Sequence, residues 1–295
     1  MKQPLRKDLE PVAASFIVKK LEEPHFDPNW HFHPHYQLFL VEEGTGTRFI
    51  GDSIKPFGPG DLVFLGPNLP HLWRSDQVYF NRQSDWKLSG LTTRGIVIYF
   101  TEDFLGNDFF EKQEMAPLRQ LLYQARQGLE WTGHTRNRTE TALHDLTTQS
   151  VGFERVISLL TLLNNLSRAT DYRYLTSPGY TNTVKPAETD RMQLVHNYVL
   201  GHFPDDLSLD TIADLAGMTS PAFCRYFKAR ANKTFSEFVS EVRIGHACKL
   251  LMHGKLNITQ ISFESGFRTL SNFNRQFKDI TGQTPSGYVK TYRHL

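Results

Sequence analysis

The chain is poor in the residues and runs that define several classes of protein. It has two cysteines in 295 residues, Cys224 and Cys248, and they form no CxxC pair. This usage argues against a disulfide scaffold or a cysteine zinc site and is typical of a reducing cytoplasm. No apolar run approaches the ~20 residues of a membrane helix, and the start, MKQPLRKDLE, does not resemble a signal peptide. We expect a cytoplasmic protein with no membrane partner.

Net charge and the common catalytic motifs are also nearly absent. The formal net charge is +2, but it is unevenly distributed. Residues 190–295 carry 13 Lys and Arg against 9 Asp and Glu, whereas residues 1–189 carry 20 against 22. A mildly basic C-terminal part is compatible with a polyanionic partner. The motifs GxSxG and HExxH and a glycine-rich phosphate loop are missing, which favours a binding protein over an enzyme.

Short strands separated by turns are predicted up to about residue 100. Gly51-Asp52 is a two-residue hairpin signal, and GPGD and GPNLPH are further turns. Many short strands at close spacing indicate a sandwich or a small barrel. The predicted strands are residues 38–41, 47–50, 53–57, 62–65 and 95–100.

The pattern becomes helical over residues 101–168. Apolar positions 156, 159, 160, 163 and 166 form one stripe, which packs on its own domain or pairs two subunits. Residues 169–189 have little periodicity, carry Pro, Gly, Ser and Thr, and are predicted to be a linker. Three parts follow: a domain at 1–168, the linker, and a helical domain at 190–295.

The helical domain contains an internal repeat. Residues 207–239 resemble residues 256–289 at an offset of 49, which becomes 50 after a one-residue insertion. A self-match this dense indicates one supersecondary unit used twice, at about 207–232 and 256–282. The matching pairs include Leu207/Leu256, Ile212/Ile261, Gly217/Gly266, Phe223/Phe273, Arg225/Arg275, Phe227/Phe277 and Lys228/Lys278.

Each repeat has the pattern of a helix-turn-helix unit. A short helix (210–216 in the first copy) precedes a glycine, Gly217 or Gly266, at which the chain turns with a positive φ. Ser220 is predicted as the N-cap of the next helix and Pro221 as part of its first turn. The expected inward side chains are Ile212, Leu215, Phe223 and Phe227 in the first copy and Phe273 and Phe277 in the second.

The outward face of each second helix is polar and basic. Arg and Asn are the side chains that read guanine and adenine edges in the DNA major groove. The helix between the units, from Ser236 to about Met252, would hold both readers on one DNA face. The candidate DNA-binding residues are Ser220, Pro221, Cys224, Arg225 and Lys228 in the first unit and Thr269, Ser271, Asn272, Asn274, Arg275 and Lys278 in the second.

Residues 190–293 resemble the DNA-binding domain of the AraC/XylS family of bacterial transcription regulators. The specific part is ESGFRTLSNFNRQFKDITGQTPSGYVK. The resemblance implies reading helices at 220–231 and 269–280, with Lys228 and Lys278 at phosphates or in solvent. It also implies a homodimer that contacts double-stranded DNA and RNA polymerase, most often as an activator. The base-facing positions that it implies are Pro221, Cys224, Arg225, Ser271, Asn272 and Arg275.

The N-terminal part contains a histidine-rich stretch, WHFHPHYQ, at residues 30–37. In a strand, His31, His33, His35 and Gln37 would share one face and line a site for a metal or a polar small molecule. Stacking on aromatic side chains favours a sugar-like effector. The candidate effector-binding residues are His31, His33, His35, Gln37, His71 and Trp73.

The spacing of this stretch also resembles the cupin motif, which pairs HxH with a later carboxylate and a later histidine. Here the matching positions are His31, His33, position 37 and His71. Gln37 departs from the motif, because an amide oxygen is a weaker ligand than a carboxylate for a transition metal. His31, His33 and His71 are the metal candidates, although no cofactor is expected.

The sequence thus predicts an α+β multidomain protein. A cupin-like β-barrel followed by helices precedes an all-α domain with two helix-turn-helix units. The favoured hypothesis is a DNA-binding transcription regulator, not an enzyme, controlled by a small molecule in the barrel. The alternative is a cupin-type metal-dependent enzyme or a metal sensor fused to a helical domain.

Overall fold

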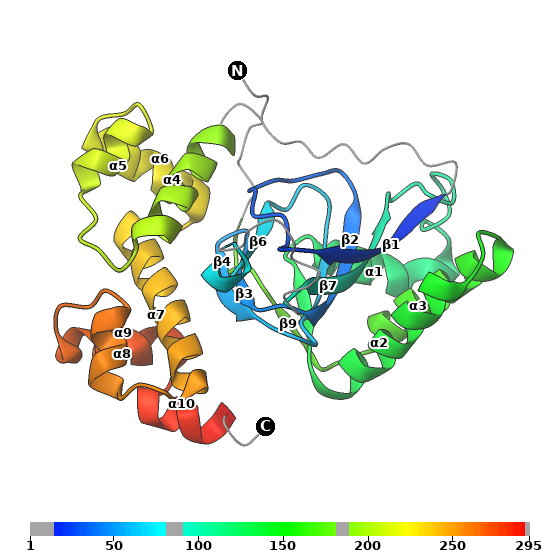
Figure 1. Cartoon of the computed structure of the whole chain (residues 1–295). Coiled ribbons are helices and arrows are strands. Elements are labelled where there is room, and N and C mark those ends of the chain that lie inside the picture. The colour runs from blue at the N-terminus through cyan, green and yellow to red at the C-terminus, as the bar shows by residue number, and fades with distance from the viewer. Residues whose placement is uncertain (1–14, 81–90, 181–188, 293–295) are drawn as a thin grey trace. The chain divides into compact units, whose positions relative to one another are not determined.

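The computed structural model describes residues 15–80, 91–180 and 189–292. The chain divides into two compact units, an N-terminal one that ends by residue 180 and a C-terminal one that starts by residue 189 (Figure 1). Within the described ranges, no helix is long and apolar enough to cross a membrane. The predicted fold class, a β-rich N-terminal part and an all-helical C-terminal part, is confirmed.

The N-terminal unit is built on two antiparallel sheets. The larger sheet has the strand order β1-β7-β2-β5-β8-β9 and the smaller one β4-β3-β6. The helices α1, α2 and α3 follow the main strands in sequence. The strands are β1 Phe16–Glu23, β2 Tyr36–Glu43, β3 Gly46–Ile50, β4 Ser53–Phe57, β5 Leu62–Leu65, β6 His71–Ser75, β7 Thr93–Phe100, β8 Leu129–Trp131 and β9 Tyr172–Tyr174. The helices are α1 Ala116–Ala125, α2 Gly133–Thr148 and α3 Phe153–Ser167, with 3-10 turns η1 Gln77–Tyr79 and η2 Gln113–Met115.

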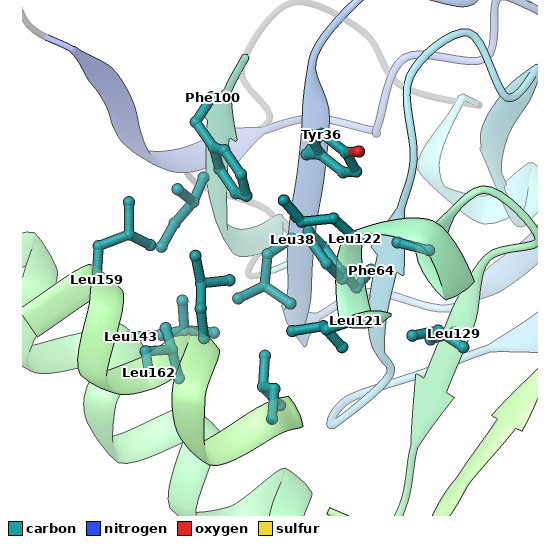
Figure 2. Packing of buried hydrophobic residues seen from close by; sticks show 14 of the residues in the cluster. Tyr36, Leu38, Phe64, Phe100, Leu121, Leu122, Leu129, Leu143, Leu159 and Leu162 are labelled. Carbon is teal, nitrogen blue, oxygen red and sulfur yellow. The ribbon is translucent and has the colours of Figure 1, made fainter. Parts of the chain in front are cut away.

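Strand β2 lies in the middle of the larger sheet and is buried on both faces. Leu38 and Leu40 point into a core shared with the three helices, as Figure 2 shows for Leu38. Phe39 and Val41 alternate with them and join a second core with residues of the smaller sheet, among them Trp73. A strand covered on both faces is continuously apolar, which explains the uninterrupted run LFLV.

Two short strands lie in regions that the sequence predicted to be helical or linker. Strand β8 interrupts the predicted helical region 101–168, and β9 lies inside the predicted linker 169–189. Each is three residues long, too short for a period-two pattern to emerge, and each is fixed by pairing, with Leu129 opposite Tyr174. The other end of the predicted linker, residues 181–188, lies outside the described ranges.

The apolar stripe of helix α3 packs inside its own unit. Leu159, Leu163 and Leu166 are buried in the core that Figure 2 shows, and Val156 and Leu160 pack against it. The stripe therefore packs on its own domain, which was one of the two interpretations left open, and does not form a surface that pairs two subunits. A different apolar set near the start of α3 is exposed: Val151, Phe153 and Ile157.

The C-terminal unit consists of helices, and its predicted repeat is confirmed. Gly217 and Gly266 have φ values of +66° and +82° at the two turns. Phe223, Phe227, Phe273 and Phe277 are all fully buried, as predicted. The helices are α4 Thr189–His202, α5 Leu209–Leu215, α6 Ser220–Ala231, α7 Phe235–His253, α8 Ile258–Glu264, α9 Leu270–Thr281 and α10 Pro285–Tyr292.

Two local predictions in the first repeat are wrong. Leu215 is 37% exposed, because α5 turns Ile212 and Ala213 inward instead. The N-cap of α6 is Thr219, and Ser220 is the first helical residue. The hydroxyl of Ser220 donates to a carboxylate oxygen of Asp210, so it ties α6 to α5.

Candidate functional site

Helix α6 separates a buried aromatic face from an exposed polar face. Phe223 and Phe227 face the core. The predicted DNA-facing residues Pro221, Cys224, Arg225 and Lys228 are all exposed, and Ser220 is half-buried. Pro221 has no backbone N–H and a thiol is a weak donor, so Arg225 is the one strong base-reading group among the positions implied on this helix.

Helix α9 has the same two faces with a richer polar side. Thr269 caps the helix by accepting a hydrogen bond from the backbone N–H of Asn272. Nη2 of Arg275 donates to Oδ1 of Asn272 at 2.9 Å, which holds the guanidinium over the outward face. The predicted residues Thr269, Ser271, Asn272, Asn274, Arg275 and Lys278 are all exposed.

Helix α7 packs against α6 and α9, the two predicted DNA-reading helices, named the recognition helices from here on. Near its start, Phe238 contacts Phe227 of α6 with ring centroids 5.2 Å apart. Further along, Ile244 and Leu251 share a core with Phe273 and Phe277 of α9. A helix of 19 residues spans ~28 Å, close to the ~34 Å of one DNA turn. The arrangement can present α6 and α9 to adjacent stretches of one duplex.

The start of α7 is fixed by a capping box. The Thr234 side chain accepts from the Glu237 backbone N–H, and the Glu237 carboxylate accepts from the Thr234 backbone N–H. These hydrogen bonds from Thr234 lower the pKa of Glu237, because they favour its charged form. The turn between α6 and α7 is therefore well defined.

Three of the predicted histidines meet in the N-terminal unit. His31, His33 and His71 each offer a ring nitrogen, and these three atoms lie within 4.8 Å of one another. His31 and His71 are brought together by a backbone bridge in which each N–H donates to the other carbonyl, at 3.2 and 2.9 Å. All three side chains are at most 5% exposed.

The hydrogen bonds of these rings fix which nitrogen is protonated. Nδ1 of His31 lies 2.7 Å from the Asn29 carbonyl oxygen, and Nδ1 of His71 lies 2.7 Å from that of Leu69. A carbonyl oxygen only accepts, so Nδ1 carries the proton and Nε2 carries a lone pair. A backbone carbonyl behind each imidazole is the usual arrangement around a metal-bound histidine.

His33 differs from the other two histidines, because both of its ring nitrogens lie near an acceptor oxygen. Its Nδ1 lies 3.1 Å from the His35 carbonyl oxygen, and its Nε2 lies 2.9 Å from Oε1 of Gln37. Burial lowers the pKa of His33 to about 4, so the ring is neutral at pH 7 and donates to only one of these two oxygens. Its Nε2 has a lone pair for a metal when Nδ1 donates to the His35 carbonyl oxygen. Four tetrahedral nitrogen ligands at ~2.1 Å from zinc lie ~3.4 Å apart. The three imidazoles thus fit a transition metal after a small contraction, with the Gln37 oxygen adjacent.

The remaining predicted effector residues are placed differently. His35 is not part of the three-nitrogen cluster, because residues 33–35 bend at Pro34 and do not continue a strand. The predicted alternation of faces over residues 31–37 is therefore wrong. Trp73 is 4% exposed and its ring meets Phe39 edge-on at 4.9 Å, so its indole belongs to the core.

A separate pocket of about 600 Å³ lies beside the C-terminal end of α1. Its walls come from the turn between β5 and β6, the residues just after β7, the end of α1, and the chain that follows β9. None of its described lining residues belongs to the predicted effector set. The sequence did not reveal them, because they come from four separate segments that share no local motif. They are Pro67, Asn68, Leu69, Glu102, Tyr123, Arg126, Gln127, Gly179 and Tyr180.

Two family models match the two units. Residues 15–146 match an AraC-like ligand binding domain, and residues 212–291 match a helix-turn-helix domain. The matched ranges cover both sheets except strand β9, and they cover both recognition helices. The second range holds the glycine turns and aromatic faces described above. The chain belongs to the AraC family of transcription regulators with an N-terminal ligand-binding domain.

Known relatives match about a third of this chain. The uncharacterised HTH-type transcriptional regulator YdeC of Bacillus subtilis is 32% identical over 103 residues, 35% of each chain. An uncharacterised HTH-type regulator of Staphylococcus aureus is 33% identical over 99 residues, 34% of this chain and 13% of the relative. The matched stretches thus span about a third or less of these relatives.

Solved structures match the chain at lower identity, and one of them covers nearly all of it. ToxT from Vibrio cholerae, solved with an unsaturated fatty acid bound, is 16% identical and covers 95% of this chain and 96% of its own, with a TM-score of 0.36. An AraC-type transcriptional regulator from Chromobacterium violaceum is 21% identical and covers 36% of this chain and 96% of its own, with a TM-score of 0.34.

Proposed function

We propose that the chain is a DNA-binding transcription regulator controlled by a small molecule bound in its N-terminal unit. The observation that carries the proposal is the pair of recognition helices, each with a buried phenylalanine face and an exposed polar face. Helix α7 packs against both and holds them in one compact unit. The proposal assigns the chain no chemical reaction.

The DNA-binding part is tested with a duplex selected from a random library by the full chain. Arg275→Ala removes a guanidinium that Asn272 already orients, so specific affinity should fall by ~1–3 kcal/mol, about 5- to 150-fold. Affinity for random duplex should change little. Lys278→Ala, one turn along the same face, is the control and should weaken both affinities alike. An equal loss on both duplexes for Arg275→Ala would contradict base reading.

Binding of the effector is the second part of the proposal. The predicted cluster around His31, His33 and His71 brings three ring nitrogens within 4.8 Å of one another, a spacing suited to a single ion. The 600 Å³ pocket beside α1 has the size of an ordinary ligand site. We therefore place the organic effector in that pocket and leave the histidine cluster to an ion.

Metal sensing is a second candidate function, favoured by the three imidazoles. A bound divalent transition metal would take its ligands from Nε2 of His31, His33 and His71, with Gln37 adjacent. Protein purified without chelators should contain about one metal per chain. The variants His33→Gln and His71→Gln should lose it, and His35→Gln, outside the cluster, should keep it. Retention of metal in His71→Gln would exclude this site.

The homodimer is a further part of the proposal and uses the exposed end of α3. Val151 and Phe153 are 74% and 73% exposed and Ile157 is 41% exposed. Phe153→Glu should shift sedimentation towards a monomer, and Val78→Glu, at an exposed apolar residue elsewhere on this unit, should not. An unchanged dimer in Phe153→Glu would move the interface away from α3.

Three features expected from the family resemblance complete the proposal. The regulator acts in the cytoplasm, where its DNA is, contacts RNA polymerase and activates transcription. A reporter driven by a promoter that contains the selected duplex tests the sign of regulation. Transcription that rises when the chain is expressed would support activation, and transcription that falls would support repression.

A further inference from the structure

The pocket beside α1 contains both signs of charge next to two phenols. Arg126 and Glu102 line it together with Tyr123 and Tyr180. We propose that this pocket binds a small zwitterion, a free α-amino acid. We further propose that the bound ligand controls how firmly residues 177–180 are held against the N-terminal unit. This inference deepens the proposed function, because it names the effector class and the step by which the effector acts.

The two charged groups are placed to receive a ligand. Nη2 of Arg126 lies 3.8 Å from Oε2 of Glu102, and the side chains are 57% and 54% exposed. A direct charged hydrogen bond is ~2.7–2.9 Å, so the pair is open enough for each partner to make shorter bonds elsewhere. A ligand carboxylate suits the guanidinium, and a ligand ammonium suits the carboxylate.

The glutamate is held in position from behind. The Tyr36 hydroxyl donates to Oε2 of Glu102 at 3.3 Å. Burial, followed by the nearby Glu102 charge, raises the pKa of Tyr36, so the phenol stays a donor. The Glu102 carboxylate lines the pocket, and a carboxylate can accept further hydrogen bonds beside the one from Tyr36.

The walls of the pocket are held together at a close backbone approach. The Gly66 N–H donates to the Ala125 carbonyl at 2.6 Å. A Cβ at Gly66 would lie 2.7 Å from the backbone N and Cα of Arg126, so the turn after β5 can approach the end of α1 only with glycine there. Arg126 and the turn residues 67–69 therefore keep a fixed separation.

The third wall is the end of the N-terminal unit. The Ser177 N–H donates to Oδ1 of Asp52 at 3.0 Å, and the Tyr180 N–H donates to the Ser177 carbonyl at 3.0 Å. Tyr180 is the last residue described before the range that starts with α4 at Thr189. A ligand that contacts Tyr180 adds to these few bonds and shifts the population in which residues 177–180 are docked.

The same turn that forms this pocket also reaches the histidines. The Asn68 N–H donates to the His33 carbonyl at 2.8 Å, and the Leu69 carbonyl accepts from Nδ1 of His71. Ligand binding at the pocket is thus connected through residues 66–71 to the histidine cluster, and any coupling between the two sites must be reciprocal.

The experiment is a thermal unfolding screen of the full chain with each of the twenty common L-α-amino acids at about 5 mM, a concentration at which millimolar ligands stabilise measurably. At least one amino acid should raise the midpoint. Its analogues without the amino group or without the carboxylate should bind more weakly. No midpoint shift with any amino acid, a shift only with common sugars screened alongside, or equal binding by either analogue would overturn the proposal.

Matched variants locate the binding site. Arg126→Gln and Glu102→Gln should each raise the calorimetric dissociation constant about tenfold or more, the loss expected for a charged hydrogen bond. Arg119→Gln, on helix α1 but outside the pocket, should leave the dissociation constant within about twofold. The affected side chains are half-exposed, so the fold should remain, as circular dichroism can verify. Unchanged affinity in Arg126→Gln would overturn the assignment.

Coupling to DNA is read on the same protein. The bound amino acid should change the affinity for the selected duplex about threefold or more. A chain that binds the duplex but no amino acid would overturn the pocket alone. A chain that binds an amino acid but no duplex would overturn the regulator. Binding of both without mutual influence would overturn the role of residues 177–180.

Discussion

A buried histidine in the DNA-binding unit should make that unit sensitive to acid. His196 of α4 is 3% exposed and its ring stacks on Phe238 of α7 at 4.9 Å. Burial lowers its pKa from 6.5 to about 3, because the site disfavours the charged imidazole. The replacement His196→Phe keeps an aromatic ring next to Phe238 and removes the titration.

The magnitude follows from proton linkage. Above pH 6.5 the ring is neutral in the folded and the unfolded chain, so the group has no effect. As the pH falls below 6.5 the unfolded chain binds the proton first, and stability is lost at ~1.36 kcal/mol per pH unit until about pH 3. Between pH 7.5 and pH 4.5, His196 alone should therefore cost the wild type ~2.7 kcal/mol.

Urea unfolding of the full chain can isolate this effect. The chain has four tryptophans, Trp30, Trp73, Trp86 and Trp131, all before residue 180, so fluorescence follows the N-terminal unit and helical circular dichroism follows both. The transition that appears in circular dichroism but not in fluorescence reports the unfolding of the C-terminal unit. In this transition, the free energy of unfolding of the wild type should fall by ~2.7 kcal/mol more than that of His196→Phe between pH 7.5 and pH 4.5. His202→Gln, exposed on the same helix, should behave as wild type. Equal losses in wild type and His196→Phe would refute the reasoning.

Three further perturbations test the packing behind the two sites. Arg48 is buried between Asp61 at 3.1 Å and Glu130 at 2.5 Å, so Arg48→Ala should destabilise the N-terminal unit by ~3–5 kcal/mol, and a loss below 1 kcal/mol in fluorescence-detected urea unfolding would contradict this. Phe277→Ala should lower the free energy of unfolding by ~3–5 kcal/mol, measured by circular dichroism, and weaken DNA binding. Unchanged stability would mean that the core beneath α9 is not required for folding of the C-terminal unit. Gly66→Ala should separate the turn after β5 from α1 and lower the midpoint of urea unfolding followed by fluorescence. Gly58→Ala, which has open space around its Cβ, should leave the midpoint unchanged. Equal midpoints in the two variants would contradict the close approach at Gly66.

The DNA-binding unit was predictable because its signals are local and occur twice. Glycine at each turn and phenylalanines four residues apart specify a tight turn and a buried helix face, and both copies agree. Leu215 was mispredicted because α5 is a seven-residue helix, in which one residue of rotation moves a side chain from core to solvent.

The N-terminal sites were predictable only in part. His31, His33 and His71 could be grouped through a resemblance, but the bend at Pro34 that excludes His35 is a tertiary feature. Arg126 and Glu102 had no signal, because residues scattered from the turn after β5 to Tyr180 meet only in the folded sheet. Strands β8 and β9 were missed for the same reason, since pairing and not periodicity defines them.

The most direct measurement is selection of duplexes from a random library by three proteins: the wild type, Arg225→Ala and Arg275→Ala. The arrangement of α6 and α9 along α7 predicts a selected DNA site with two separated sequence elements. Arg225→Ala should lose the base preference in one element, and Arg275→Ala should lose it in the other. Enrichment of no sequence by the wild type, or loss of the same positions in both variants, would contradict the account.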